Sequence, residues 1–227
     1  MQRFSKVSGI AALLLSGLFV AFVFLLAVVL PQQGLGPGGL DDPTAGIPFV
    51  SISPLPTIIN LIYLGIALAF IMIMLGLYER LQPLAPAVMV TVVIAGVIAS
   101  TLFLTYAMLN FVATPKIVSL SATNVKMSEI VYVALRVTAN AMSAGGLFAA
   151  GSALFLTSWA ALKYDGLPKM LSVLMGFAAV SMILSFASLS IGLLGVILAP
   201  LWSVWLGVIL LRTPATVSVS NLRIEGA

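Results

Sequence analysis

The chain of 227 residues contains no cysteine and no histidine, and only 7% of its residues are charged. Without thiols and imidazoles it has no disulfides, no thiolate metal sites, no histidine-ligated haem and none of the commonest acid–base catalyst. The sequence also offers no nucleophile–base pair, no glycine-rich phosphate loop and no metal-ligand cluster. We therefore expect a protein that is not an enzyme and binds no cofactor through this chain alone.

Charge is scarce because apolar residues take its place: 62% of the chain is hydrophobic, against about 45–50% in soluble domains. A soluble protein of this composition would aggregate, so the chain is predicted to be a polytopic membrane protein with lipids as partners. The net charge of +4 fits basic residues gathered where membrane helices meet the cytoplasm. It gives no reason to expect a nucleic-acid partner.

Six apolar stretches have about the length of a transmembrane helix, since a bilayer core of about 30 Å requires about 20 helical residues. They are Ser8–Leu30, Thr57–Leu77, Ala87–Phe111, Glu129–Leu162, Lys169–Leu189 and Ile191–Leu211. The predicted fold is an all-α, polytopic transmembrane helix bundle of about six spans, formed by residues 1–212 as one domain. A cleavable signal peptide is the alternative for the first stretch, but no A-x-A-like cleavage site follows it.

The basic residues predict the orientation of these spans. With the N-terminus in the cytoplasm, seven of them fall inside: Arg3, Lys6, Arg80, Lys163, Lys169, Arg212 and Arg223. Only Lys116 and Lys126 fall outside, together with Asp41 and Asp42. Because cytoplasmic loops of membrane proteins are enriched in Lys and Arg, both termini are predicted to be cytoplasmic, which requires an even number of spans.

The first external loop, residues 31–56, contains five glycines and six prolines. This composition is expected to resist regular helix. Its apolar second half, residues 47–54, favours a segment that lies on the membrane surface or against a neighbouring subunit, and a flexible loop is the alternative. The tail, residues 213–227, alternates apolar and polar residues, which predicts an extended cytoplasmic segment able to add to the sheet edge of a partner.

Polar residues recur in the fourth span at steps of three or four and therefore share one helical face. They are Glu129, Tyr132, Arg136, Asn140 and Ser143. A guanidinium in hydrocarbon is costly and normally faces a partner, a water-filled cavity or the headgroups. Glu129 is two turns from Arg136, so the partner of Arg136 is expected elsewhere, with Asn110 and Tyr106 as candidates. Three interpretations stay open: an interfacial arginine, a pore, proton path or binding site, and a contact to another subunit.

The same span contains a repeat of small residues at every fourth position: Ala141, Gly145, Ala149 and Ala153. Small side chains allow two membrane helices to approach closely. We therefore expect this repeat to form a helix-packing groove.

Three segments resemble the internal turns and final helix of a bacterial six-helix membrane family, domain of unknown function 4386. They are Leu77–Pro86, Gly166–Leu171 and Pro200–Arg212, and the resemblance covers about the last two-thirds of the chain. It implies a multi-pass protein of the bacterial cytoplasmic (inner) membrane and supplies no activity. The loop at 31–56 is unusual for that family.

The function predicted from these features is a non-catalytic accessory or structural subunit of a larger bacterial membrane complex, plausibly an energy-converting one. Its partners would be other membrane subunits reached through the 31–56 loop and the 213–227 tail. Missing histidine disfavours pigment or haem ligation, whereas contact with lipid or quinone stays open. The alternatives are a small transporter or channel using the stripe from Glu129 to Asn140, and a membrane sensor whose tail recruits a partner.

Overall fold

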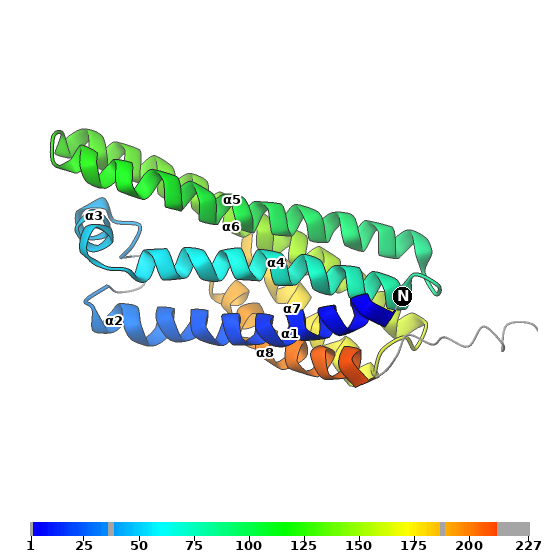
Figure 1. The fold of residues 1–227 in the computed structure, drawn as a ribbon. Helices are drawn as coiled ribbons and strands as arrows, with labels where there is room; N and C mark the ends of the chain where they lie inside the picture. The colour runs from blue at the N-terminus through cyan, green and yellow to red at the C-terminus, as the bar shows by residue number, and fades with distance from the viewer. Residues whose placement is uncertain (1, 36–38, 187–188, 213–227) are drawn as a thin grey trace, which may run out of the picture.

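The computed structural model describes residues 2–35, 39–186 and 189–212, and every regular element in these ranges is a helix (Figure 1). The elements are α1 (Gln2–Phe24), the π-helical turn η1 (Leu25–Val29), α2 (Leu30–Gln32), α3 (Pro43–Ile52), α4 (Leu55–Leu81), α5 (Pro86–Ser121), α6 (Val125–Lys163), α7 (Lys169–Ile183), the 3₁₀ turn η2 (Leu184–Phe186) and α8 (Leu189–Arg212). The tail at 213–227, predicted to be extended, lies outside the described residues.

Five helices are long and apolar enough to cross a membrane, judged by length and composition. They cover Ser5–Gln32, Leu55–Leu81, Pro86–Ser121, Val125–Lys163 and Leu194–Arg212. The fifth predicted stretch, Lys169–Leu189, corresponds to α7, which has 15 residues and a length of about 22 Å. The regular elements of the described ranges are thus all helical, with five candidate spans and two shorter apolar helices, α3 and α7, as expected for a multi-pass membrane protein.

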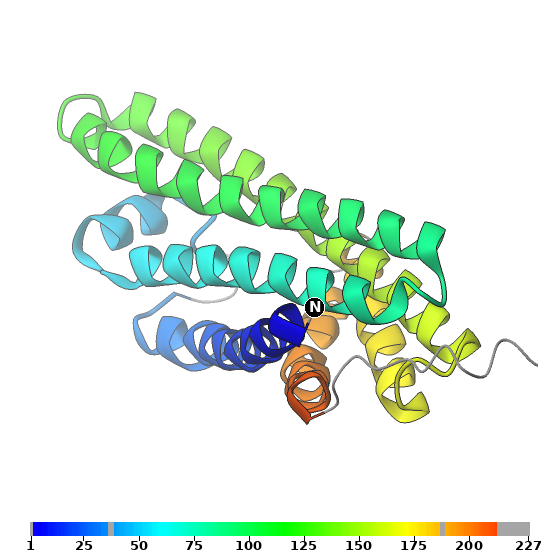
Figure 2. The ribbon, with the colours of Figure 1, turned by 45° about the vertical axis from the view of Figure 1, so that its right-hand side comes forward.

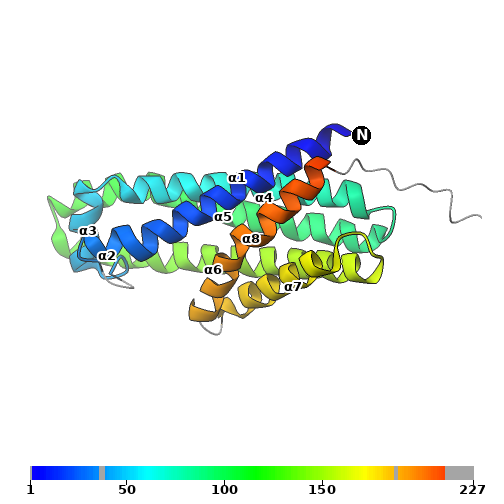
Figure 3. The same cartoon turned by 90° about the horizontal axis from the view of Figure 1, so that it is seen from below.

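The six long helices form a closed ring in which each helix packs against two neighbours. The order around the ring is α1, α4, α5, α6, α7 and α8, and α8 returns to α1 (Figure 2). Two hydrogen bonds show that α1 and α8 are antiparallel: Ser5 Oγ donates to the Leu210 carbonyl and Ser16 Oγ donates to the Pro200 carbonyl. The start of α1 therefore lies beside the end of α8 (Figure 3).

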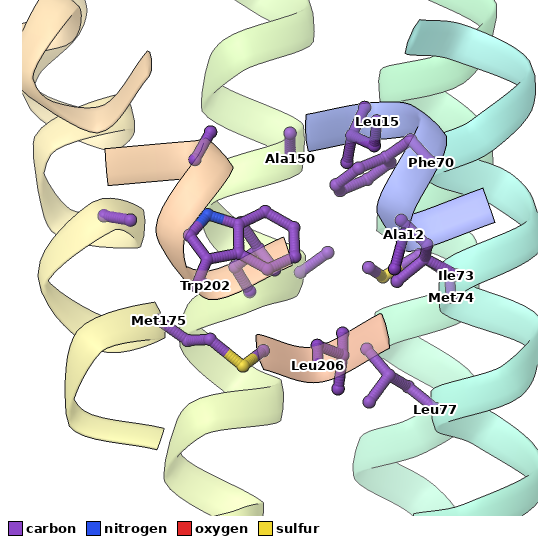
Figure 4. Close-up of a cluster of buried hydrophobic side chains, with 14 of the residues drawn as sticks. Ala12, Leu15, Phe70, Ile73, Met74, Leu77, Ala150, Met175, Trp202 and Leu206 are labelled. Atoms are coloured by element: carbon purple, nitrogen blue, oxygen red, sulfur yellow. The ribbon is translucent and has the colours of Figure 1, made fainter. Parts of the chain in front are cut away.

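Large apolar side chains fill the middle of the ring. Leu15 of α1, Ile73, Met74 and Leu77 of α4, Met175 of α7, and Trp202 and Leu206 of α8 are all fully buried (Figure 4). Small residues bring the backbones close to this centre. A Cβ at Gly151 of α6 would lie only 2.8 Å from the Ala179 carbonyl oxygen of α7, so α6 and α7 are in direct backbone contact there.

The helices of the ring differ greatly in length. The 36 residues of α5 and the 39 residues of α6 span about 54 and 58 Å, more than the roughly 40–45 Å of a bilayer with its headgroups. The α5–α6 turn therefore projects furthest, and α7 and α8 meet only part-way along the bundle (Figures 1 and 3). We call the end with the α5–α6 turn the outer end, and the end with residues 82–85 and 164–168 the inner end.

The loop at 31–56 was predicted to resist regular helix, and this prediction is wrong because it contains the ten-residue helix α3. Asp42 caps the helix by accepting hydrogen bonds from the Thr44 amide (2.8 Å) and hydroxyl (2.7 Å). Pro43 occupies the first helical position, where a missing N–H costs nothing. The buried side of α3 faces this chain's own helices, where Ile47 packs against Ile117 and Leu135.

Candidate functional site

The polar stripe of α6 faces α3 and α4 at the outer end of the bundle. α6 begins at Val125, four residues earlier than predicted, because Asn124 Oδ1 accepts the Met127 amide at 3.0 Å and caps the helix. The early start adds a turn outside the stripe. Arg136 therefore lies three turns inside a long helix, about 16 Å from Val125 and about 40 Å from Lys163 at the inner end.

Arg136 pairs with Asp41, which sequence reasoning had not chosen as its partner. The Arg136 Nη2 and Nε atoms lie 2.8 and 2.9 Å from Asp41 Oδ1, and Asn140 Nδ2 donates to the same oxygen at 3.3 Å. The Arg136 side chain is 16% exposed and that of Asp41 is 49% exposed. One carboxylate oxygen thus accepts hydrogen bonds from two residues of α6, Arg136 and Asn140, and it holds the chain just before α3.

Tyr132 holds the residue next to Asp41. Its hydroxyl donates to the Leu40 carbonyl at 2.6 Å, and its ring is buried beneath α3. A Cβ at Gly46 of α3 would overlap the Tyr132 hydroxyl, so glycine is required for this close approach. Tyr132, Arg136 and Asn140 together form a clamp on the N-terminal side of α3, which we call the α3 clamp.

The inner end of the stripe joins an aromatic cluster instead of α3. The hydroxyls of Ser143 and Tyr63 share a hydrogen bond of 3.1 Å. The Tyr63 ring stacks at a tilt on Tyr106, with centroids 4.1 Å apart, and meets the edge of Phe22 at 5.4 Å. Glu129, at the opposite end of the stripe, forms no hydrogen bond or ion pair with any residue that the structure describes. The stripe is therefore one helical face with two separate sets of contacts.

A small cavity of about 30 Å³ lies beside Arg136. It is lined by Leu40, Val50, Pro56, Ile59, Asn60, Tyr106, Asn110, Thr114, Tyr132, Leu135 and Arg136. Tyr106 and Asn110, the two candidate partners from the sequence, both line this cavity beside Arg136. The Nδ2 atom of Asn110 donates to the Tyr106 carbonyl at 2.8 Å. The cavity has room for about two water molecules and is too small for a quinone ring.

The sequence shows Asp41 as one of few acidic residues, but nothing in the sequence distinguishes it from the others as the partner of Arg136. Asp41, Asp42 and Glu129 are the acidic residues at the outer end, and 95 positions separate Asp41 from Arg136. Two adjacent aspartates in a glycine-rich loop look alike from sequence. The structure separates them, because Asp42 caps α3 while Asp41 reaches α6.

The small-residue repeat lies mostly inside the bundle. Ala149 and Ala153 are buried, and a Cβ at Gly145 would approach Leu102 to 3.2 Å. Ala141 is exposed and takes no part in this packing. Among the glycines of α6, Gly151 is the one whose added Cβ would meet a neighbouring backbone, and the four-residue repeat did not include it.

No family model matches the chain, and neither a curated protein nor a solved structure matches it. The resemblance to domain of unknown function 4386 therefore rests on the three segments given above. Function has to be argued from the geometry of the site, because a helix bundle alone implies no activity.

Proposed function

We propose that the protein is a non-catalytic subunit of a larger complex in a bacterial cytoplasmic membrane, and that its outer end is a docking platform for another subunit. The proposal rests on exposed apolar side chains in the outer part of α6, whose distance from the inner end exceeds the thickness of a bilayer core. The bacterial location is supported by the family resemblance alone.

The proposed topology has six crossings with both termini of the chain in the cytoplasm. Arg80, Lys163, Lys169 and Arg212 lie at the inner end, where α1 also starts. Lys116 and Lys126 lie near the outer turn. The positive-inside rule then places the inner end in the cytoplasm. α7 and η2 together reach about 28 Å, close to the roughly 30 Å of a bilayer core.

The docking platform is the outer part of α6. If Lys163 marks the inner membrane boundary, Arg136 lies about 40 Å away, beyond a core of about 30 Å. Four apolar side chains on one face of α6 lie at this depth or further out: Met127, Ile130, Val133 and Val137, which are 42–65% exposed. Lipid tails do not reach most of this face, so it is suited to burial against a partner protein.

The α3 clamp supports this platform from behind. Asp41 and Leu40 are bound to α6 through Arg136 and Tyr132. α3 then packs across α5 and α6 and stiffens the projecting hairpin. In this interpretation the role of the polar stripe is to hold α3 against α6, and this maintains the shape of the docking platform.

The transporter or channel alternative requires a passage along the stripe. Arg136 is instead occupied by Asp41, and buried side chains including Trp202 and Leu206 fill the centre of the ring. The sensor alternative depends on the tail at 213–227, which lies outside the described residues. Neither alternative has a specific observation in its favour.

Affinity purification from native membranes tests the proposal. We expect unrelated membrane subunits to copurify in fixed ratio with the wild-type chain, and to be lost with the double variant Ile130→Gln, Val137→Gln. Val112→Gln is the matched control, because Val112 is 56% exposed at the same end but belongs to α5. Purification of the wild type alone, with solute transport in liposomes that Arg136→Ala abolishes, would overturn the proposal.

A further inference from the structure

Two asparagine side chains are buried beside the α3 clamp without full hydrogen bonding. Asn60 of α4 is 5% exposed and Asn110 of α5 is 6% exposed. Among the described residues, Asn60 has no hydrogen-bond partner for its side chain, and Asn110 uses only its Nδ2. A buried amide without partners destabilises the fold, so buried polar groups of this kind are normally satisfied by protein or by ordered water.

Both asparagines line the cavity of about 30 Å³ described above, together with Tyr106, Tyr132 and Arg136. Both side chains therefore border a shared space. A water molecule requires about 10–15 Å³ of such space and two to four polar partners. The cavity meets both conditions for about two waters, whereas an apolar cavity of the same size would stay dry.

The charges around the cavity select a neutral ligand. Arg136 would repel a cation and Asp41 would repel an anion, and the 2.8 Å ion pair between them leaves little net charge. The lining offers donors and acceptors together, because an asparagine amide provides both an N–H₂ group and a carbonyl oxygen. Water can donate to one side and accept from the other.

We infer that the cavity beneath α3 is a hydration site, in which about two ordered water molecules link Asn60 to Asn110 and Arg136. The waters hydrate the side of the guanidinium that faces the bundle, while Asp41 binds it from the side of α3. This inference concerns a ligand of the site and does not depend on whether the outer end docks a partner.

Radiolytic hydroxyl-radical labelling of the intact protein in nanodiscs, read by mass spectrometry, tests the inference, because bound water produces radicals beside the side chains it touches. Tyr106 and Tyr132 are 7% and 3% exposed, and Phe70, in the apolar core, is 3% exposed. After correction for intrinsic reactivity, we expect both tyrosines to be labelled at least about fivefold faster than Phe70. Equal rates would show a dry cavity and overturn the inference.

Two variants sharpen the test. Asn60→Leu removes the amide from the cavity and is expected to slow labelling of Tyr106 at least about threefold. Ser100→Ala is the control, because Ser100 is a buried α5 residue that does not line the cavity. This variant should leave the labelling rate of Tyr106 unchanged. If Asn60→Leu does not fold, the labelling rates of Tyr106 and Tyr132 relative to Phe70 in the wild-type protein still test the inference.

Exchange of chloride for gluconate, and of sodium for a large organic cation, separates water from an ion. We expect the labelling rates of Tyr106 and Tyr132 to be unchanged by both exchanges. A rate that follows either ion would identify an ion as the occupant and overturn the assignment to water.

Discussion

The inner and outer halves of this bundle are held together by different physical means. In the inner half, six helices meet around fully buried apolar side chains such as Trp202 and Leu206. In the outer half, α3 is held by the packing of Ile47 and Phe49 and by hydrogen bonds that converge on Leu40 and Asp41, and the Asp41 side chain is half exposed. Apolar packing is distributed over many atoms, whereas the clamp depends on a few directional contacts.

This difference predicts two kinds of response to substitution. Damage to the inner half should lower the stability of the whole bundle, because the packed side chains come from six helices. Damage to the clamp should release α3 and leave the ring intact, since local opening of a weakly packed segment needs less free energy than global unfolding. The predictions below test this contrast, from the largest expected effect to the smallest.

Leu206→Ala should have the largest effect. Leu206 is fully buried at the centre of the ring, so truncation leaves a cavity and should lower the free energy of unfolding by about 2–5 kcal/mol. Leu201→Ala is the control, because Leu201 is 59% exposed on the same helix and should change stability by less than about 0.5 kcal/mol. Unfolding in mixed detergent micelles measures both, and equal losses would contradict a packed centre.

Arg136→Ala should have a smaller and more local effect. It removes a charged donor from Asp41 and should cost about 1–3 kcal/mol in the docking of α3. Hydrogen–deuterium exchange should rise in residues 43–52 and stay unchanged in α8.

A double-mutant cycle with Asp41→Ala checks that the pair is responsible. The two single variants should give similar exchange in α3, and the double variant should add little, because each removes the same contact. Additive effects would mean that Arg136 has a different main partner.

Gly46→Ala tests the close approach of α3 to α6. The added Cβ overlaps the Tyr132 hydroxyl and should displace it from the Leu40 carbonyl, at a cost of about 1 kcal/mol for the lost hydrogen bond. The loss in the double variant with Tyr132→Phe should be smaller than the sum of the two single losses, because both changes remove the same hydrogen bond. Thermal midpoints of the four proteins measure the coupling, and a loss equal to that sum would contradict it.

The helix cap of α3 predicts a weak pH dependence. Hydrogen bonds from the Thr44 hydroxyl and then the Thr44 amide lower the pKa of Asp42 below its ordinary value of 3.8. The capping contribution is therefore present above about pH 4 and is lost as the pH falls through the lowered pKa. Amide exchange of residues 43–46 should rise there in the wild type. Asp42→Asn, which caps without titrating, should show no such step.

Trp202→Phe should have the smallest effect, although the residue is fully buried. The indole Nε1 of Trp202 has no hydrogen-bond partner among the described residues, and removing an unsatisfied donor gains about 1–3 kcal/mol. The smaller ring loses a similar amount in packing. We expect a net change within about 1 kcal/mol, against about 3–5 kcal/mol for Trp202→Ala. A large loss of stability in Trp202→Phe would indicate that the indole N–H has a hydrogen-bond acceptor.

The α6 residues of the site could be predicted from the sequence, but the residues that they contact elsewhere in the chain could not. The spacing of Tyr132, Arg136 and Asn140 placed them on one helical face, and the structure keeps them together in the clamp. The partner Asp41 could not be identified, because a loop of 31–56 with many glycines and prolines has no period from which to infer its position. For the same reason α3 was missed, since its start depends on the single cap at Asp42.

The sequence by itself determined that the chain is helical and suited to a membrane, because apolar content and helix length are local properties that need no knowledge of contacts. It also determined which polar side chains share a face, since the helical period is local too. Only the tertiary structure decided that Arg136 meets Asp41, that Gly151 of α6 lies against the backbone of α7, and that α5 and α6 project beyond the other helices. Those features depend on how residues far apart in the chain pack in three dimensions, and no short-range pattern specifies that.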